Sequence, residues 1–182
     1  KGGAMVNKLL VGKVDDNFNW LPLWVHLQDT AGVMKLLLEN WIADATVESC
    51  GMQFENFYAI AEFVAATHDI GKATSYFQAI ICKKVPILYD NIVSSGLIVC
   101  ENMLHRGKTP HSYAGQWILQ SDTVSINLPE SVANVIGAHH GAPCPRKTLN
   151  GVDDLLVVYP SNFYGEEYDS SIQSMQWQSI WN

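Results

Sequence analysis

The sequence lacks a long apolar run, because no stretch reaches the ~20 residues that a membrane-spanning helix needs. Its start also lacks a basic segment followed by an apolar one, so we expect no signal peptide and no membrane partner. A Cys-x-x-Cys pair is missing too, which is typical of reduced thiols in a cytoplasmic protein. A catalytic cysteine is the alternative, but no neighbouring signature supports it at any of the four widely spaced cysteines, Cys50, Cys82, Cys100 and Cys144.

Basic residues are few as well. The chain has 11 Lys and Arg residues against 18 Asp and Glu residues, which gives a net charge of −7. A free-standing, high-affinity nucleic-acid binder is therefore disfavoured, since phosphate contacts need Lys and Arg. A metal-dependent enzyme that acts on phosphates is not excluded, because bound cations can reverse the local field.

The composition predicts one folded domain. Its 182 residues, 48% of them hydrophobic, are enough for a substantial core. We expect residues 1–4, ahead of Met5, to be a cloning remnant, and residues 5–182 to form a single mostly α-helical domain, either complete or lacking its last elements. Helices are expected over 22–43, 54–68 and 72–81 and from 110 and 129, with a strand-like entry at 6–19, a loop at 160–171 and a last helical piece.

Four of these helices each place a histidine on an apolar stripe. His26 shares its stripe with Val33, Leu37 and Trp41, and His68 ends the row of Phe57, Ala61 and Val64. His111 opens a helix for which Thr109 is the expected cap, and His139 with His140 precedes Gly141, the expected helix stop. The same pattern places Trp24 and Trp41 in the core, whereas Trp177 and Trp181 near the end are candidates for a docking surface.

A single buried histidine usually has its own hydrogen bond in the core, because an unsatisfied polar group costs ~1–3 kcal/mol. Five histidines on four helices, one of them joined to Asp69, are better explained by a shared metal centre. Asp69 could bridge two metals that activate a water and neutralise a phosphodiester. Lys72 would then stabilise charge on the phosphate or leaving oxygen, or else be an ordinary exposed lysine at a helix end.

Four motifs carry a family resemblance, and they are Leu-Pro-Leu-Trp-Val-His at 21–26, His-Asp-Ile-Gly-Lys at 68–72, His-Ser-Tyr-Ala-Gly at 111–115 and Ala-His-His-Gly at 138–141. Over about residues 18–145 the chain resembles the HD-superfamily metal-dependent phosphohydrolases. More narrowly, it is similar to the HD nuclease domain of the type I CRISPR-associated helicase-nuclease. The resemblance implies an HD-domain helical bundle with the metal site between helices, and a single-stranded DNA nuclease in antiviral defence.

The resemblance also implies the ligands and partners. One metal would be held by His26, His68 and Asp69, and the second by Asp69, His111, His139 and His140. The family uses iron, manganese, nickel or cobalt, and sometimes magnesium, and histidine-rich ligation favours the transition metals. The implied partners are single-stranded DNA, a helicase domain in the same or a separate chain, and an RNA-guided CRISPR surveillance complex.

The chain departs from the family pattern in one respect. The family supplies a further aspartate to the first metal from a late helix, and none of Asp153, Asp154 and Asp169 is an obvious match. Two other functions stay open at this point. One is an HD phosphohydrolase that acts on nucleotides, and the other is a non-catalytic module in which metal joins the helices or which serves for docking.

Overall fold

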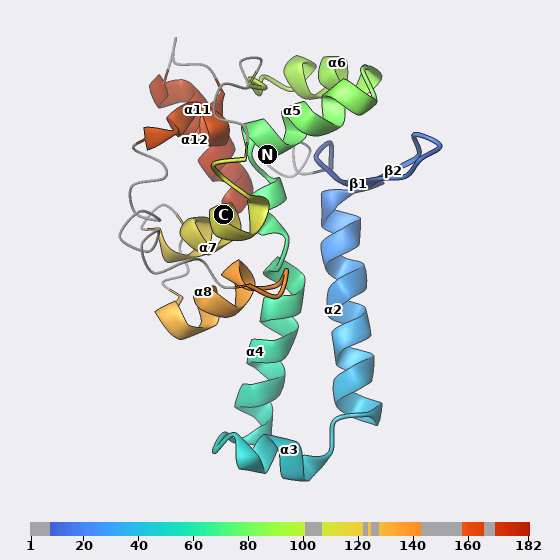
Figure 1. Cartoon of the computed structure of the whole chain (residues 1–182), viewed down its shortest axis with the longest axis vertical. Coiled ribbons are helices and arrows are strands. Elements are labelled where there is room, and N and C mark those ends of the chain that lie inside the picture. The colour runs from blue at the N-terminus through green and yellow to red at the C-terminus, as the bar shows by residue number, and fades with distance from the viewer. Residues whose placement is uncertain (1–7, 101–106, 122–123, 125–127, 143–157, 166–169) are drawn as a thin grey trace.

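The computed structural model describes residues 8–100, 107–121, 124, 128–142, 158–165 and 170–182. Its architecture is almost entirely helical, as predicted (Figure 1). In the part of the chain that is described, no helix is long and apolar enough to cross a membrane.

A short β-hairpin begins the described chain. Strand β1 (Val11–Val14) pairs antiparallel with β2 (Trp20–Pro22), which refines the strand-like entry expected over 6–19. Pro22 ends β2 and is also the residue before α2 (Leu23–Asn40), so this helix starts where the proline predicts it. The hairpin therefore lies directly at the N-terminal end of the first long helix.

Two long helices form a helical hairpin. Helix α2 lies beside α4 (Phe54–Thr67), and the short α3 (Asp44–Ser49) connects their far ends (Figure 1). Leu38 and Val47 are fully buried between these helices. The helix predicted over 54–68 is confirmed, whereas α3 was not foreseen because its region was expected to be a loop.

Beyond α4 the chain passes through the 3₁₀ turn η1 (Ile70–Lys72) into α5 (Ser75–Lys84) and α6 (Ile87–Ser94). Helix α7 (His111–Gln120) then packs against both η1 and α8 (Glu130–Gly137). This places η1 between the long helical hairpin and the α7–α8 pair.

The last helices complete the core. Helix α11 (Pro160–Tyr164) packs on α5, and α12 (Ser170–Trp181) packs on α11. Trp177 is fully buried, and Trp181 is buried with its Nε1 donating a hydrogen bond of 2.7 Å to the carbonyl oxygen of Ala73. The prediction of a loop over 160–171 is therefore wrong at 160–164 and 170–171, while 166–169 lie outside the described residues. The prediction of a docking surface at the two tryptophans is also wrong.

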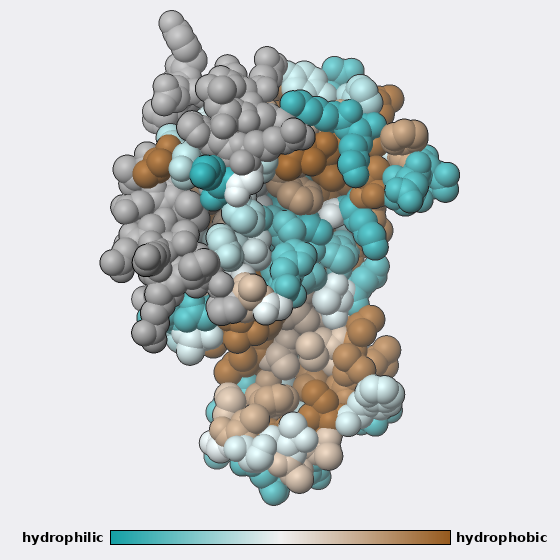
Figure 2. Space-filling model, in the orientation of Figure 1, coloured by the Kyte–Doolittle hydropathy of each residue, from teal (hydrophilic) through white to brown (hydrophobic). Residues whose placement is uncertain are grey.

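The inward stripe predicted on α2 is wrong beyond its first turns. Val33 is 56% exposed, Leu37 37% and Trp41 85%, and Trp24 at 39% is not a core residue either. The reason is that α2 and α4 extend past the rest of the molecule. In this extension, neighbouring helices cover a narrow part of the α2 surface around Leu38. Figure 2 shows the resulting apolar surface over this extension.

Two predicted helix ends also need correction. Thr109 does not cap α7, because Pro110 precedes the helix and the buried Thr109 hydroxyl accepts a hydrogen bond of 2.9 Å from Asn162 Nδ2. Helix α8 ends at Gly137 rather than just before Gly141. Gly141 still has the left-handed φ of 89° that glycine tolerates, but in the turn that follows the helix.

Candidate metal centre

The His-Asp pair lies where α4 changes into η1. His68 is the C-cap of α4 and still has helical dihedral angles, and Asp69 leaves the helix with φ −105° and ψ 16°. The Lys72 backbone N–H donates to the Asp69 carbonyl oxygen at 2.9 Å, which closes the 3₁₀ turn. The turn directs the Asp69 side chain into the molecule, where the residue is 4% exposed.

Four imidazoles and one ammonium surround the Asp69 carboxylate. Oδ2 lies 2.8 Å from His26 Nε2, 3.2 Å from His68 Nε2 and 2.7 Å from Lys72 Nζ. On the other side, Oδ1 lies 3.1 Å from Nε2 of His111 and 3.3 Å from Nε2 of His139. The two oxygens of one carboxylate therefore face different histidines, brought together from four parts of the chain.

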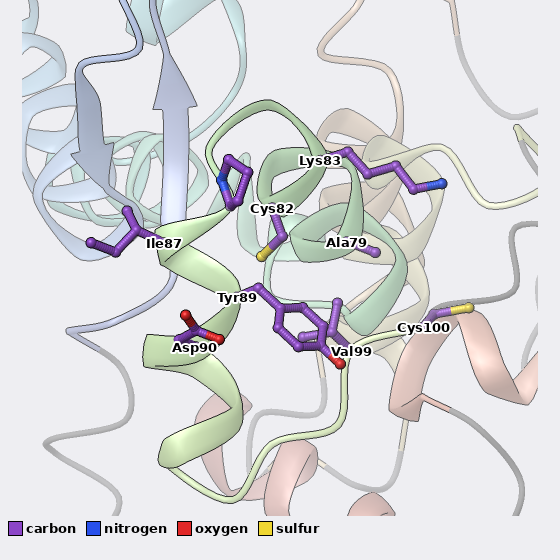
Figure 3. Close-up of a pocket in the computed structure, with 9 residues that line it drawn as sticks. Ala79, Cys82, Lys83, Ile87, Tyr89, Asp90, Val99 and Cys100 are labelled. Carbon is purple, nitrogen blue, oxygen red and sulfur yellow. The ribbon is translucent and has the colours of Figure 1, made fainter.

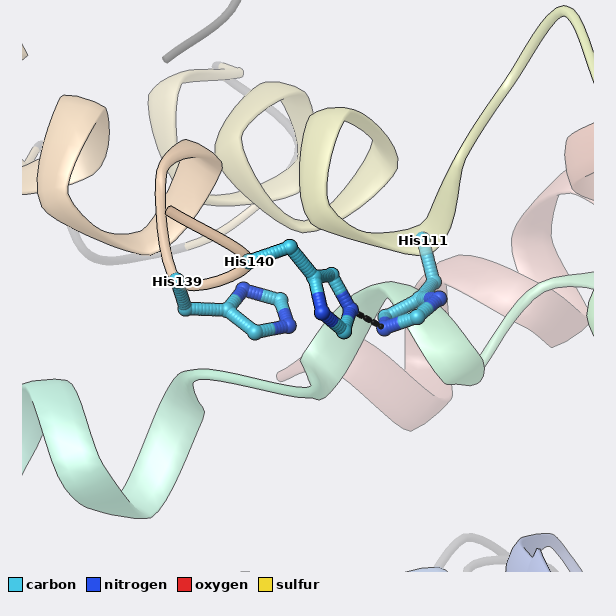
Figure 4. Close-up of side chains that lie close together, drawn as sticks. All are labelled: His111, His139 and His140. Carbon is cyan, nitrogen blue, oxygen red and sulfur yellow. Dashed lines mark hydrogen bonds between the residues drawn. The ribbon is translucent and has the colours of Figure 1, made fainter. Parts of the chain in front are cut away.

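The histidines form two groups that Asp69 joins. In the first, the donor atoms of His26, His68 and Asp69 lie within 4.8 Å of one another, and the same holds for His111, His139 and His140 in the second. Figure 4 shows the second group, in which Nε2 of His140 lies 2.8 Å from Nε2 of His111. All seven site residues predicted from the sequence, including Lys72, thus lie in one place.

The ring orientations suit metal ligation. Nδ1 of His68 lies 2.8 Å from the Ala65 carbonyl oxygen, and Nδ1 of His139 lies 2.7 Å from that of Ile136. A carbonyl oxygen can only accept, so each Nδ1 carries a proton, and when the ring is neutral its Nε2 presents a lone pair toward Asp69. This tautomer is the one in which a neutral imidazole binds a metal through Nε2.

Two buried atoms of the site have no hydrogen-bond partner among the described residues, namely Asp69 Oδ1 and His139 Nε2. With a neutral His139 ring, these two atoms bring lone pairs together at 3.3 Å that form no hydrogen bond, and leaving them unpaired costs free energy. A divalent cation bound by both atoms would satisfy them. The donor set therefore fits a metal, and its histidine content favours a transition metal.

The carboxyl group of Asp69 is held in its ionised form. Burial by itself raises the pKa of this carboxyl. Hydrogen bonds from the His111 and His139 rings, when their Nε2 atoms carry a proton, and from the other surrounding donors outweigh burial, so that without a metal the pKa is below its ordinary value. On the exposed side of the site, burial and then the charges of its two neighbours lower the pKa of His140. A lowered pKa favours the neutral His140 ring, which is the form that binds a metal.

Lys72 belongs to the interior of the site. Its Nζ donates 2.9 Å to the Gly12 carbonyl oxygen as well as contacting Asp69, and the side chain is 13% exposed. The alternative of an ordinary exposed lysine is therefore wrong. The sequence did not indicate Gly12 as the partner of Lys72, since no side-chain motif identifies a backbone carbonyl group that accepts a hydrogen bond.

Two close backbone approaches hold the site together. A Cβ on Gly71 would collide with the His111 carbonyl oxygen and the Gly115 nitrogen, so η1 and α7 can meet only because residue 71 is glycine. A Cβ on Gly12 would lie 3.2 Å from the His26 Cβ. These contacts bring His111 and His26 to Asp69 from opposite sides.

A cavity of about 680 Å³ lies between α5 and α6 (Figure 3). Its described lining includes none of the histidines and is mainly apolar, with the Cys82 thiol and the Asp90 carboxylate among its polar groups. Burial raises the pKa of Cys82 to about 11, so its thiol stays protonated and is a poor nucleophile. The cavity is therefore not the candidate catalytic site, and the structure does not favour a catalytic role for Cys82.

Some predicted positions lie outside the described residues. They include the three candidates for a late aspartate ligand, Asp153, Asp154 and Asp169, and also Cys144. The two other cysteines lie as expected, with Cys50 exposed and Cys100 buried.

The chain was compared with known proteins. It is 32% identical over 186 residues to the CRISPR-associated nuclease/helicase Cas3 of Streptococcus thermophilus, an alignment that covers 88% of this chain and 18% of that protein. The chain thus spans about a fifth of the length of this relative. No solved structure matches it significantly. Residues 12–178, which include every histidine of the site, match the family described as Cas3, HD domain, and the chain therefore belongs to this family.

Proposed function

We propose that this chain is a metal-dependent nuclease domain that hydrolyses phosphodiester bonds of single-stranded DNA in CRISPR interference. The observation that carries the proposal is the Asp69 carboxylate, whose two oxygens face two different histidine groups. One carboxylate placed between two sets of ligands is an arrangement that suits two-metal hydrolysis of phosphate esters. Membership in a family named for Cas3 supports the same reaction.

In this proposal His26, His68 and Asp69 hold one divalent ion, and Asp69, His111, His139 and His140 hold the second. Iron, manganese, nickel or cobalt would suit these ligands, and magnesium less well. When bound, such ions lower the pKa of a coordinated water toward ~7 and neutralise the phosphodiester.

The chain's own groups then have distinct tasks. Asp69 is the catalytic carboxylate that fixes the two sets of ligands relative to each other. Lys72 Nζ, next to Asp69 Oδ2, supplies a positive charge that would stabilise the anionic phosphate or the leaving oxygen. His140 is the exposed member of the set, so we place the entry of the substrate on its side.

We further propose that the domain, residues 5–182, works in the cytoplasm with a helicase domain in the same or a separate chain, and with an RNA-guided CRISPR surveillance complex. The name of the Streptococcus thermophilus relative pairs a nuclease with a helicase. The net charge of −7 supports the view that a partner protein provides most of the contacts with DNA.

The test is a cleavage assay on end-labelled single-stranded DNA. Metal-free protein should be inactive, and added manganese, cobalt or nickel should start cleavage, which a chelator should then abolish reversibly. A parallel reaction with free nucleotides separates the alternatives, since faster turnover of nucleotides than of DNA would indicate a nucleotide phosphohydrolase. Metal binding without hydrolysis of either substrate would indicate the non-catalytic module.

The Cys82→Ala variant checks the assignment of the site. Its rate of single-stranded DNA cleavage should stay within about twofold of wild type, because a thiol that remains protonated at neutral pH is not the nucleophile. The measurement is the same assay at matched metal concentration. Complete loss of cleavage by folded Cys82→Ala would place the chemistry in the cavity between α5 and α6 instead.

A further inference from the structure

Gln78 is a fully buried polar side chain outside the two histidine groups. It lies on α5, and its side-chain hydrogen bonds with the described residues all go to backbone groups. Its Nε2 donates to the carbonyl oxygens of Lys72 at 2.8 Å and Val11 at 3.0 Å, and its Oε1 accepts from the Val11 N–H at 3.1 Å. One amide therefore joins the turn that carries Lys72 to strand β1.

The amide of Gln78 supplies hydrogen bonds that the irregular pairing of β1 leaves unmade. The pairing of β1 with β2 is irregular between Val11 and Lys13, and Val11 lies opposite Pro22, which has no N–H to offer. Both polar backbone groups of Val11 are bonded to Gln78 instead. The position of β1 relative to η1 is thus set by the Gln78 side chain.

Strand β1 in turn contacts the helix that carries His26. The Leu23 N–H donates 2.7 Å to the Leu10 carbonyl oxygen at the start of α2. The next point of contact is Gly12, where an added Cβ would lie 3.2 Å from the His26 Cβ. The Gly12 carbonyl oxygen also accepts from Lys72 Nζ at 2.9 Å, and the same Nζ contacts Asp69. Strand β1 therefore adjoins His26 directly and Asp69 through Lys72.

We propose that Gln78 is a positioning residue of the metal centre, which holds β1 in place and thereby fixes His26 relative to Asp69. The inference rests on the proposed function, because it assigns a role toward the metal site formed by His26, His68 and Asp69. Among the described residues, Gln78 forms no hydrogen bond with these side chains, and it acts through Val11, Gly12 and Lys72. Residues that orient metal ligands in this way typically contribute about 10–100-fold to metal affinity or activity.

Gln173 offers a matched control. It is also a buried glutamine whose amide bonds an extended backbone segment, since its Oε1 accepts from the Ile98 N–H at 3.0 Å and its Nε2 donates to the Gly96 carbonyl oxygen at 3.3 Å. None of its partners belongs to β1, η1 or the histidine groups. Gln78→Met and Gln173→Met therefore each remove a buried backbone partner of the same kind, and only the first does so next to the metal centre.

The experiment is a titration of the metal-free chain with Co²⁺, followed by the visible absorption of the bound ion and by calorimetry. Gln78→Met should weaken Co²⁺ binding about 10–100-fold and change the absorption spectrum, whereas Gln173→Met should lower the melting temperature and leave both unchanged. A His26→Ala background adds a double-mutant cycle. There, Gln78→Met should alter the remaining Co²⁺ affinity by less than about twofold, because the residue it positions is gone.

Two results would overturn the proposal. If wild type binds Co²⁺ and folded Gln78→Met binds it equally well with the same spectrum, Gln78 is merely structural and the metal centre stands. If wild type binds no Co²⁺, the proposed function fails together with the inference. Should Gln78→Met not fold, Gln78→Glu replaces it, since it keeps the volume and the acceptor for Val11 while removing donors, and the same outcomes apply.

Discussion

The Asp69→Asn variant is expected to lose single-stranded DNA cleavage by more than about 100-fold, since even the loss of an outer partner of a metal ligand costs about 10–100-fold. Asparagine keeps the volume of the side chain but not the charge, and it offers one oxygen where the carboxylate offers two. Because Oδ1 and Oδ2 face different histidine groups, the substitution affects both at once. Helix content, measured by circular dichroism, should be retained.

Asp29→Asn is the matched control for this substitution. Asp29 lies exposed on α2, less than one turn from His26, so the same change of charge is made close to the site but outside it. Its cleavage rate should equal that of wild type. A fully active Asp69→Asn variant would contradict a catalytic role for Asp69, and a variant that unfolds would favour the module in which metal only joins the helices.

The Gly71→Ala variant should be destabilised by more than about 3 kcal/mol, beyond the usual cost of overpacking. A Cβ at this position collides with backbone atoms of α7, at the carbonyl oxygen of His111 and the nitrogen of Gly115. Neither atom can yield by a change of rotamer, so η1 and α7 must separate. For a domain of this size the melting temperature should fall by at least about 6 °C.

Gly32→Ala is the control for the glycine substitution. Gly32 lies in the interior of α2, where an added Cβ meets no atom within 4 Å. Alanine there should stabilise the helix by about 0.5–1 kcal/mol, because it has the higher helix propensity. Thermal unfolding of both variants checks the pair, and a Gly71→Ala variant as stable as Gly32→Ala would disprove the close approach of η1 to α7.

The position of the site could be predicted because its signals are local. Each histidine occurs near a helix end together with a proline, a glycine or an apolar row, and those residues fix helix limits through backbone geometry. His68 and His111 are both within one residue of a helix end in the structure. We inferred that the four histidine-bearing helices meet at Asp69 from the types of their residues, because a sequence by itself shows no contacts.

Burial along α2 could not be predicted in the same way. Helical periodicity tells which residues share a face, but it does not tell how far a neighbouring element extends along that face. Val33 and Trp41 therefore share the stripe of His26 and still lie exposed. Trp177 shows the opposite error, because a tryptophan near the end of a sequence can lie at the centre of the fold.

The supporting contacts of the site were also beyond the sequence. Lys72 is bonded to the Gly12 carbonyl oxygen 60 positions away, and Gln78 to Val11 at a separation of 67. Contacts of a side chain with a distant backbone have no sequence motif, since every residue carries the same carbonyl group. The side chains that meet at Asp69 were thus predictable, and the backbone groups that hold them in place were not.

The most direct test of the account is the metal content of the chain, measured by elemental mass spectrometry after reconstitution with manganese, cobalt or nickel and removal of free ions. The two histidine groups that share Asp69 predict two ions per wild-type chain and a marked loss of both in Asp69→Asn. A wild-type chain that retains no transition metal would contradict the shared metal centre and leave the histidines as ordinary core residues.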